Sequence, residues 1–172
     1  MKKIAVILLA AALAVCVCGC LSRREGVTRE FLSEQDAAEN MLEEIIKCTE
    51  EGDTESFMNL FSDYSRNSQP ELEEQIREMM DFYEGKMESY QGNASSHEKS
   101  EHGRTVSSEL KAHYSLITDK ANYRIAFQYR MIDEENPDQE GLVSFEIVTE
   151  EAFDRDDFLW TYADNPGVYV QR

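Results

Sequence analysis

Three consecutive segments in the second half of the chain alternate apolar and polar residues with a period of two. The apolar positions are Leu110, Ala112, Tyr114 and Leu116, then Tyr123, Ile125, Phe127, Tyr129 and Met131, then Val143, Phe145 and Ile147. Because successive side chains of a strand point to opposite faces, this pattern predicts three strands with one buried face. Turn residues over 119–122 and a polar stretch over 133–141 separate the segments, so we expect an antiparallel meander.

The first half of the chain shows helical periodicity instead. Apolar residues recur at three- and four-residue steps from Ala38 to Thr49, after a capping-box pattern that begins at Ser33. Glycine is the residue type that most often ends a helix in the left-handed conformation. We therefore expect this first helix to end at Gly52.

Two more helices should follow before the strands. Asp53 is a favoured N-cap residue and precedes apolar residues between 57 and 64, which predicts a short helix. After a polar break, Pro70 suits the first turn of a third helix, whose apolar face should run from Leu72 to Met87. Helices followed by strands indicate an α+β fold, with N-terminal helices packed on an antiparallel sheet.

Two other regions are less regular. Tyr90 and its neighbours can add an earlier strand, and the polar segment GNASSHEKSEHG (92–103) predicts a mobile hairpin loop. The tail from Phe153 to Tyr169 is rich in aromatic residues, so we expect it to be docked on the domain.

The chain is strongly acidic, with a formal net charge of −18 at pH 7 over 172 residues. A field of this sign repels phosphate backbones, which excludes nucleic acid as a partner. It equally disfavours adsorption of the whole domain to an anionic bilayer.

The first twenty residues have the layout of an exported protein. Two lysines follow Met1, and Ile4 to Val17 is an unbroken apolar run, as in secretory signals. Val17-Cys18-Gly19-Cys20 resembles the lipobox of bacterial lipoproteins. The resemblance implies that residues 1–19 are a signal peptide and that the Cys20 thiol receives a lipid. The protein would then be anchored in the cell membrane, facing outside the cytoplasm.

Other interpretations of these cysteines are weaker. Cys16 and Cys18 each follow a valine, a poor fit to a peptidase subsite that takes small residues. A zinc or iron–sulfur site would need further ligands at suitable spacing, which the sequence lacks. An uncleaved transmembrane anchor is the more serious alternative, since no charge occurs between Ile4 and Ser22.

The mature chain resembles the NTF2-like (cystatin-like) superfamily in its order of elements. Segments 51–62, 118–148 and 165–170 are similar to an uncharacterised family of bacterial lipoproteins with that fold. The resemblance implies a lipidated Cys20 and tether over 20–35, then one NTF2-like domain over 36–172 in which a curved sheet wraps helices into a cone. The family carries no assigned activity, so no catalytic residue can be transferred.

Candidate binding residues are few. Aromatic side chains can line the mouth of such a cone, although the same periodicity is typical of plain core. These candidates are Tyr83, Tyr90, Tyr114, Tyr123, Phe127, Tyr129 and Trp160, with Tyr162 as a further aromatic of the tail. Arg124 and Arg130 are cations on the opposite sheet face, which predicts an interaction surface that pairs with acids, as in a homodimer.

No motif for a reaction is present. His97 and His102 are five residues apart in a polar segment, which is not the spacing of a metal-binding helix, and the pattern around His113 is typical of an exposed strand residue. The sequence therefore predicts no metal and no cofactor. We expect a non-enzymatic domain that binds a small molecule or an envelope protein. The alternatives are a small isomerase or dehydratase with a Tyr/Asp pair in the cone, and a structural accessory that docks through the sheet face.

Overall fold

The computed structural model describes residues 34–162 and 165–172. The predicted signal peptide, Cys20 and most of the tether lie outside these described residues. In chain order the elements are α3 (Glu34–Glu51), α4 (Thr54–Leu60), α5 (Asp63–Ser68), α6 (Leu72–Phe82), β1 (Met87–Glu101), β2 (Arg104–Thr118), β3 (Asn122–Asp133), the 3-10 helix η1 (Pro137–Gln139), β4 (Gly141–Thr149), α7 (Glu150–Phe153) and β5 (Gly167–Gln171).

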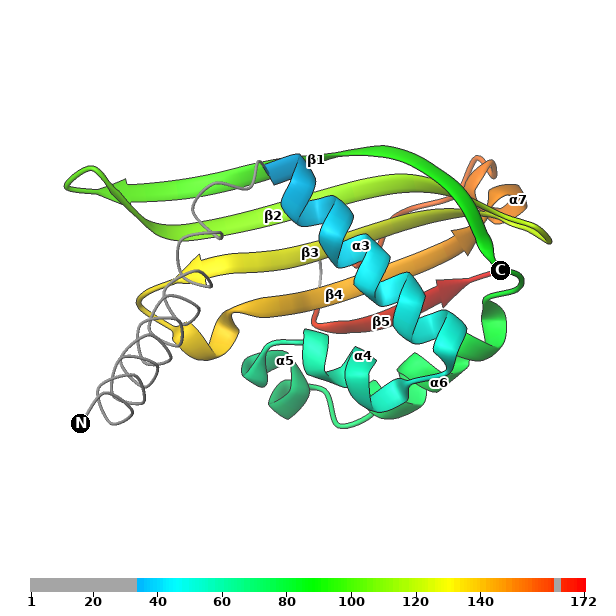
Figure 1. The fold of residues 1–172 in the computed structure, drawn as a ribbon, viewed down its shortest axis with the longest axis horizontal. Helices are drawn as coiled ribbons and strands as arrows, with labels where there is room; N and C mark the ends of the chain where they lie inside the picture. Colours follow the sequence, from blue (N-terminus) through cyan, green and yellow to red (C-terminus); the bar gives the residue numbers. More distant parts are fainter. Residues whose placement is uncertain (1–33, 163–164) are drawn as a thin grey trace, which may run out of the picture. The chain divides into compact units, whose positions relative to one another are not determined.

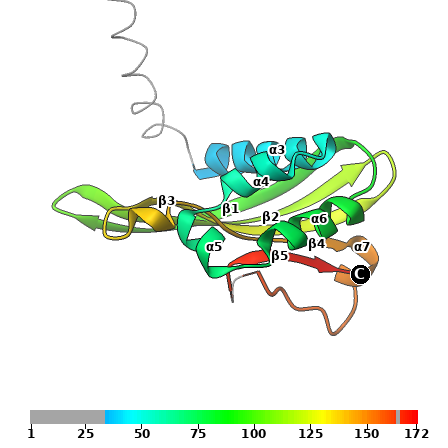
Figure 2. The same cartoon turned by 90° about the horizontal axis from the view of Figure 1, so that it is seen from below.

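The five strands form one sheet in the order β1-β2-β3-β4-β5. Neighbours are antiparallel except the last pair, in which β5 runs parallel to β4. The helices α3 to α6 lie on one side of the sheet (Figures 1 and 2). The α+β prediction, with N-terminal helices packed on the sheet, is confirmed, whereas the NTF2-like cone stays a prediction.

The core lies between these helices and the facing side of the sheet. Leu42, Ile45 and Phe57 come from the helices and meet Phe127 and Phe145 from the strands, all with 0% exposure. Phe57 packs edge-on against Phe145, with ring centroids 6.0 Å apart. Burying an apolar side chain of this size contributes about 1.5–3 kcal/mol, so this layer supplies most of the stabilising free energy.

The predicted end of the first helix and the predicted start of the second are confirmed, but the second helix ends at Leu60, so the prediction that it reaches Tyr64 is wrong. Gly52 has φ +68° directly after α3, and the Asp53 carboxylate accepts the Ser56 N–H at 2.9 Å to cap α4. The predicted polar break instead contains α5, a six-residue helix whose N-cap hydroxyl, that of Ser62, accepts from Ser65 N–H. The third helix ends at Phe82, so the prediction that it includes Met87 is wrong, and this residue belongs to β1.

The prediction of a mobile loop over 92–103 is wrong. β1 runs unbroken to Glu101 and pairs with β2 along its whole length, which makes a long hairpin. His102 and Gly103 join the two strands with φ of 53° and 79°. Two consecutive positive φ values are the signature of a type I′ turn, whose twist matches that of the paired strands.

A β-bulge changes the register of β4. Gln128 pairs with Ser144 whereas the next residue, Tyr129, pairs with Leu142, so Val143 is the extra residue. Leu142 is consequently buried in the core, and Val143 is half-buried outside it. The predicted alternation, with Val143 and Phe145 on the same buried face, is wrong at this residue.

Candidate functional site

The side of the sheet that faces away from α3 to α6 is called the outer face below. One row of it crosses four strands through the paired residues His113, Ala126, Glu146 and Tyr169. After α7 the chain returns along this side (Figure 2). Residues 158–162, called the strap below, bind to the middle of this row.

A buried carboxylate holds the strap. Glu146 has 0% exposure and accepts the backbone N–H groups of Thr161 and Tyr162, each at 2.7 Å. The side-chain amide of Gln171 donates to its other oxygen. A buried charge without hydrogen-bond partners would destabilise the folded state strongly. These three donors compensate the charge of Glu146 inside the protein.

A histidine and a tyrosine meet beside this carboxylate. The Tyr162 hydroxyl lies 3.1 Å from His113 Nε2. Burial and, secondarily, the positive charge of Lys111 lower the pKa of His113 below 6.5. Burial and the nearby negative charge of Glu146 raise the pKa of Tyr162. Both effects favour a neutral histidine next to a neutral phenol.

Aromatic rings surround this pair. Trp160 lies 5.5 Å from the His113 ring and 6.0 Å from that of Tyr162, measured between centroids. Phe158 packs edge-on against Trp160 at 5.0 Å and also contacts Phe153 at 5.0 Å. The prediction that the aromatic tail is docked is confirmed for the strap. His113 is exposed as a residue, as predicted, but Trp160 and Tyr162 cover one side of its ring, and this local burial is what lowers its pKa.

The structure does not bring all the predicted pocket-lining residues together. Tyr114, Tyr123 and Phe127 are 0–3% exposed and belong to the core between the helices and the sheet. Tyr83 is also buried there, while the half-buried Tyr90 and Tyr129 pack against the same core. Trp160 lies on the other side of the sheet, against His113.

Polar side chains of α3 bind the hydroxyls of three of these tyrosines. Tyr83 donates to Glu50 at 3.3 Å, and Tyr90 donates to Glu43 at 2.9 Å. The Gln35 amide donates to the Tyr114 hydroxyl at 3.4 Å. These polar partners explain how the phenols can pack against an apolar core.

Desolvation and nearby acids keep these phenols protonated. Burial, followed by the Glu43 carboxylate, raises the pKa of Tyr90 to about 12. Burial and the charge of Glu39 raise the pKa of Tyr114 to about 12. Neither phenol is activated as an acid or base near neutral pH.

Arg124 is paired within the chain. Its guanidinium binds the Glu150 carboxylate at 2.6 Å, donates to the Ser115 hydroxyl, and lies 5.0 Å from the centre of the Phe153 ring. It thereby ties β3 to α7. Its role in a homodimer stays a prediction.

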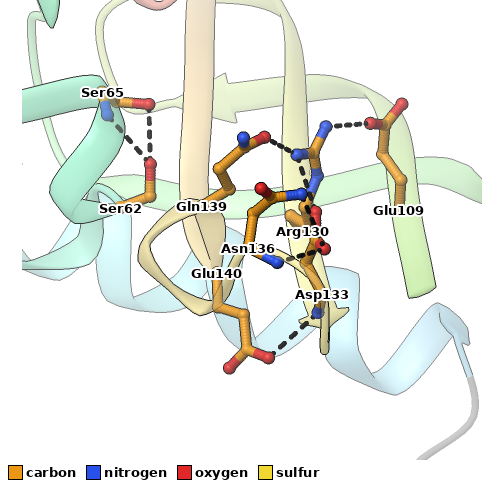
Figure 3. Close-up of polar contacts among 8 residues, drawn as sticks. All are labelled: Ser62, Ser65, Glu109, Arg130, Asp133, Asn136, Gln139 and Glu140. Carbon is orange, nitrogen blue, oxygen red and sulfur yellow. Dashed lines mark hydrogen bonds and ion pairs between the residues drawn. The ribbon is translucent and has the colours of Figure 1, made fainter. Parts of the chain in front are cut away.

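Arg130 is the centre of a second polar cluster (Figure 3). It binds Glu109 on β2 at 3.0 Å and Asp133 at 3.1 Å, and it donates to Gln139. Asp133 in turn accepts the backbone N–H of Asn136 at 2.9 Å. These bonds close the polar loop after β3 and commit Asp133, Asn136 and Gln139 to holding it in place.

Two open hollows lie on the surface away from the strap. One, of about 460 Å³, lies at the tip of the β1–β2 hairpin, and its lining includes His102, Arg104 and Glu134. The other, of about 250 Å³, lies between α3 and the start of β1, with Glu43, Glu50 and Lys86 in its lining. None of the predicted aromatic residues lines either hollow.

The described part of the chain holds neither a metal-binding cluster nor a membrane-spanning helix. Within residues 34–162 and 165–172, His, Cys, Asp and Glu side chains form no group of three or more that could hold a metal ion. No helix over the same ranges is long and apolar enough to cross a bilayer.

Sequence reasoning missed the role of Glu146. In a strand with alternating burial, an acid between Phe145 and Ile147 looks like a solvated outward position. Two of its three donors are backbone N–H groups of a segment 15 and 16 residues away. Backbone donors leave no mark in a sequence, so no pattern could have identified this site.

Comparison with protein families gives one result. Residues 44–150 match a family described as "Domain of unknown function (DUF5104)", which covers more than half of the chain. A comparison with curated proteins gives no match.

Proposed function

The chain belongs to the DUF5104 family, and we propose that it is a bacterial lipoprotein anchored at Cys20, whose NTF2-like domain binds a partner protein outside the cytoplasm. The anchoring part rests on the sequence alone. A basic start, an apolar run to Val17 and the Gly19-Cys20 pair have the order of a lipoprotein signal.

The packing of the aromatic side chains favours binding of a protein over binding of a small molecule. Tyr114, Tyr123 and Phe127 fill the space between helices and sheet where a cone-type fold would hold a ligand. Ligand sites of drug size need a cavity of roughly 300–1,000 Å³ with apolar walls. The two hollows described above are lined mainly by charged side chains and are open to solvent. Binding is therefore expected on the outside of the domain.

The enzymatic alternative lacks a supporting observation. It predicts a Tyr/Asp pair inside the cone. Among the described residues, the buried aspartate is Asp133, and its side chain binds Arg130 and Asn136 at the loop after β3. It is thus committed to holding that loop.

Anchoring is tested by Cys20→Ala in the native host, with Cys18→Ala as the matched control. Cells are labelled with a radioactive fatty acid and fractionated. Cys20→Ala should lose the label and either leave the membrane fraction or accumulate as precursor, whereas Cys18→Ala should keep label and location. A label retained by Cys20→Ala would contradict lipidation at this residue.

The nature of the ligand is tested by native mass spectrometry of the gently purified mature chain. A bare mass is expected, because the interior is filled. A mass excess that disappears on denaturation would show a captured small molecule and overturn the proposal that the domain serves protein binding.

A further inference from the structure

The strap presents an apolar side chain to solvent. Leu159 is 77% exposed, compared with 44% for Tyr64 and 44% for Ile117, the other large apolar residues that are exposed in the described part of the chain. We propose that Leu159, with the flanking rings of Phe158 and Trp160, is the docking surface for a partner protein that offers an apolar socket edged by Lys or Arg. This inference rests on the proposed function and names the surface and the partner's chemistry.

A single exposed leucine needs no special explanation on a protein surface. Leu159 differs because its neighbours continue the apolar surface. Phe158 and Trp160 are half-buried, and their rings are 5.0 Å apart. Phe153 extends the group at 5.0 Å from Phe158. Interfaces are enriched in such rings at their centres, and a leucine beside them adds area that a partner can bury.

The backbone of the strap is fixed on both sides of Leu159. Its own carbonyl accepts the Gln171 amide at 3.0 Å. On the following side, the backbone N–H groups of Thr161 and Tyr162 donate to Glu146. On the preceding side, Phe158 N–H donates to the Arg155 carbonyl at 3.1 Å. An anchored backbone lowers the ordering entropy that binding would otherwise cost, so Leu159 is displayed in a prepared conformation.

The acidic segment that directly precedes the strap favours a basic partner. The segment from Glu150 to Asp157 carries five acids and a single arginine, Arg155. That arginine binds Asp157 at 3.2 Å and the carbonyl of Arg172 at 3.3 Å. Within the described residues, the side chains of Glu151, Asp154 and Asp156 have no ion pair. Complementary charges steer association and select partners. The partner's socket should therefore be edged by basic side chains.

The same charges argue against two other occupants. An anionic bilayer would be repelled by the acids of residues 150–157, which precede Leu159 in the chain. A second copy of this chain would bring another strongly acidic surface against the first, since the whole sequence has a net charge of −18. A basic partner protein is the occupant that removes this repulsion.

The test is photo-crosslinking with the full-length lipidated protein in cells. A benzophenone amino acid replaces Leu159 in one strain, and Ile117 or Tyr64 in two control strains. A protein adduct is expected from position 159 and not from the controls. Mass spectrometry of the adduct should place Lys or Arg next to the crosslinked apolar residue of the partner.

Charge dependence is measured in the same strains. Asp154→Lys with Asp156→Lys should reduce the adduct from position 159 by about tenfold, the size typical of a lost interface determinant. Glu55→Lys with Glu74→Lys makes the same change of net charge at exposed sites on α4 and α6 and should leave the adduct unchanged. Equal adducts in both charge variants would overturn the basic-partner inference.

The remaining outcomes separate this inference from the proposed function. Adducts from Ile117 or Tyr64 alone would place docking elsewhere and overturn the inference while the interaction function stands. A lipid adduct, or one of twice the chain's mass, would identify the membrane or a second copy and also overturn it. Absence of adducts from all three positions would overturn the inference, whereas the proposed function is overturned by a captured small molecule in the native mass measurement.

Discussion

The backbone N–H of Tyr162 donates to the carboxylate of Glu146 at 2.7 Å, although Glu146 lies 16 residues earlier and is fully buried. Thr161 donates to the same oxygen at the same distance. The charge of a strand residue thus holds the returning chain against the sheet. The strap, its aromatic rings and the exposed Leu159 all depend on this carboxylate.

Glu146→Gln should loosen the strap. The carboxylate of Glu146 only accepts, whereas the glutamine side chain has an NH2 group that donates. This NH2 group would face the donors of Thr161, Tyr162 or Gln171 and could not accept from them. A hydrogen bond to a charged group contributes about 1.5–3 kcal/mol, and we expect a loss of that size in the free energy of unfolding. Denaturant unfolding monitored by Trp160, the single tryptophan of the chain, measures it.

Glu151→Gln is the matched control for this experiment. Glu151 is exposed on α7, and such substitutions change stability by about 0.5 kcal/mol or less. Equal effects of the two substitutions would show that the buried carboxylate does not hold the strap.

The His113–Tyr162 contact makes stability depend on pH. Burial lowers the pKa of His113 below 6.5, so the unfolded chain takes up this proton at a higher pH than the folded one. The stability that a neutral His113 contributes is fully present above pH 6.5. It is lost as the pH falls through the pKa that His113 has in the folded protein. Unfolding curves at about pH 7.5 and about pH 5.5 should show a smaller loss in His113→Gln than in the wild type. A parallel loss in both proteins would refute the role of this histidine.

The Arg130 cluster should behave as a coupled unit. Arg130→Met leaves Asp133, whose side chain is 11% exposed, without its cation and should cost about 2–4 kcal/mol. A double-mutant cycle with Asp133→Asn should give a coupling energy of about 1–3 kcal/mol.

The exposed pair Lys47–Glu44 provides the comparison for that cycle, because its side chains are 60% and 56% exposed. Its coupling energy should be below about 0.5 kcal/mol. Similar couplings in both cycles would mean that burial does not strengthen the Arg130–Asp133 pair.

Gly141, the first residue of β4, lies too close to the backbone of Ser62 for a larger residue to fit. Its φ is +130°, and an added Cβ would lie 2.7 Å from the Ser62 nitrogen. Gly52 also has a positive φ, +68°, but a Cβ added there would have no atom within 4 Å. Thermal unfolding should show a cost of about 1–2 kcal/mol for Gly52→Ala from backbone strain alone. Gly141→Ala should cost clearly more, and equal costs would contradict the steric part of this argument.

Secondary structure was predictable where one face of an element is buried. β2 and β3 bury alternate residues in the core, and the period-two pattern identifies both. β1 is an edge strand whose residues are largely exposed on both faces, so its polar sequence shows no alternation and has the composition of a loop. Its pairing comes from β2 and from the turn at His102 and Gly103, which the common Asn-Gly signal does not cover.

The site was less predictable than the fold, for a different reason. The aromatic residues stand out in the sequence as apolar anchors, but residue type alone does not tell which side of the sheet Trp160 occupies. Trp160 lies on the outer face because the strap carries it there. The strap lies there because Glu146 binds its backbone N–H groups. Long-range contacts of this kind become visible only when the chain is folded.

The strand order of the sheet also bears on how quickly the protein can form. Because β1 to β5 are neighbours in the same order as they occur in the sequence, the pairings between β1 and β4 need no distant part of the chain. Closing a short connection costs less chain entropy than closing a long one. The chain can therefore assemble the meander progressively, one hairpin after another. Only β5, which pairs in parallel after the strap has crossed, must await the last residues.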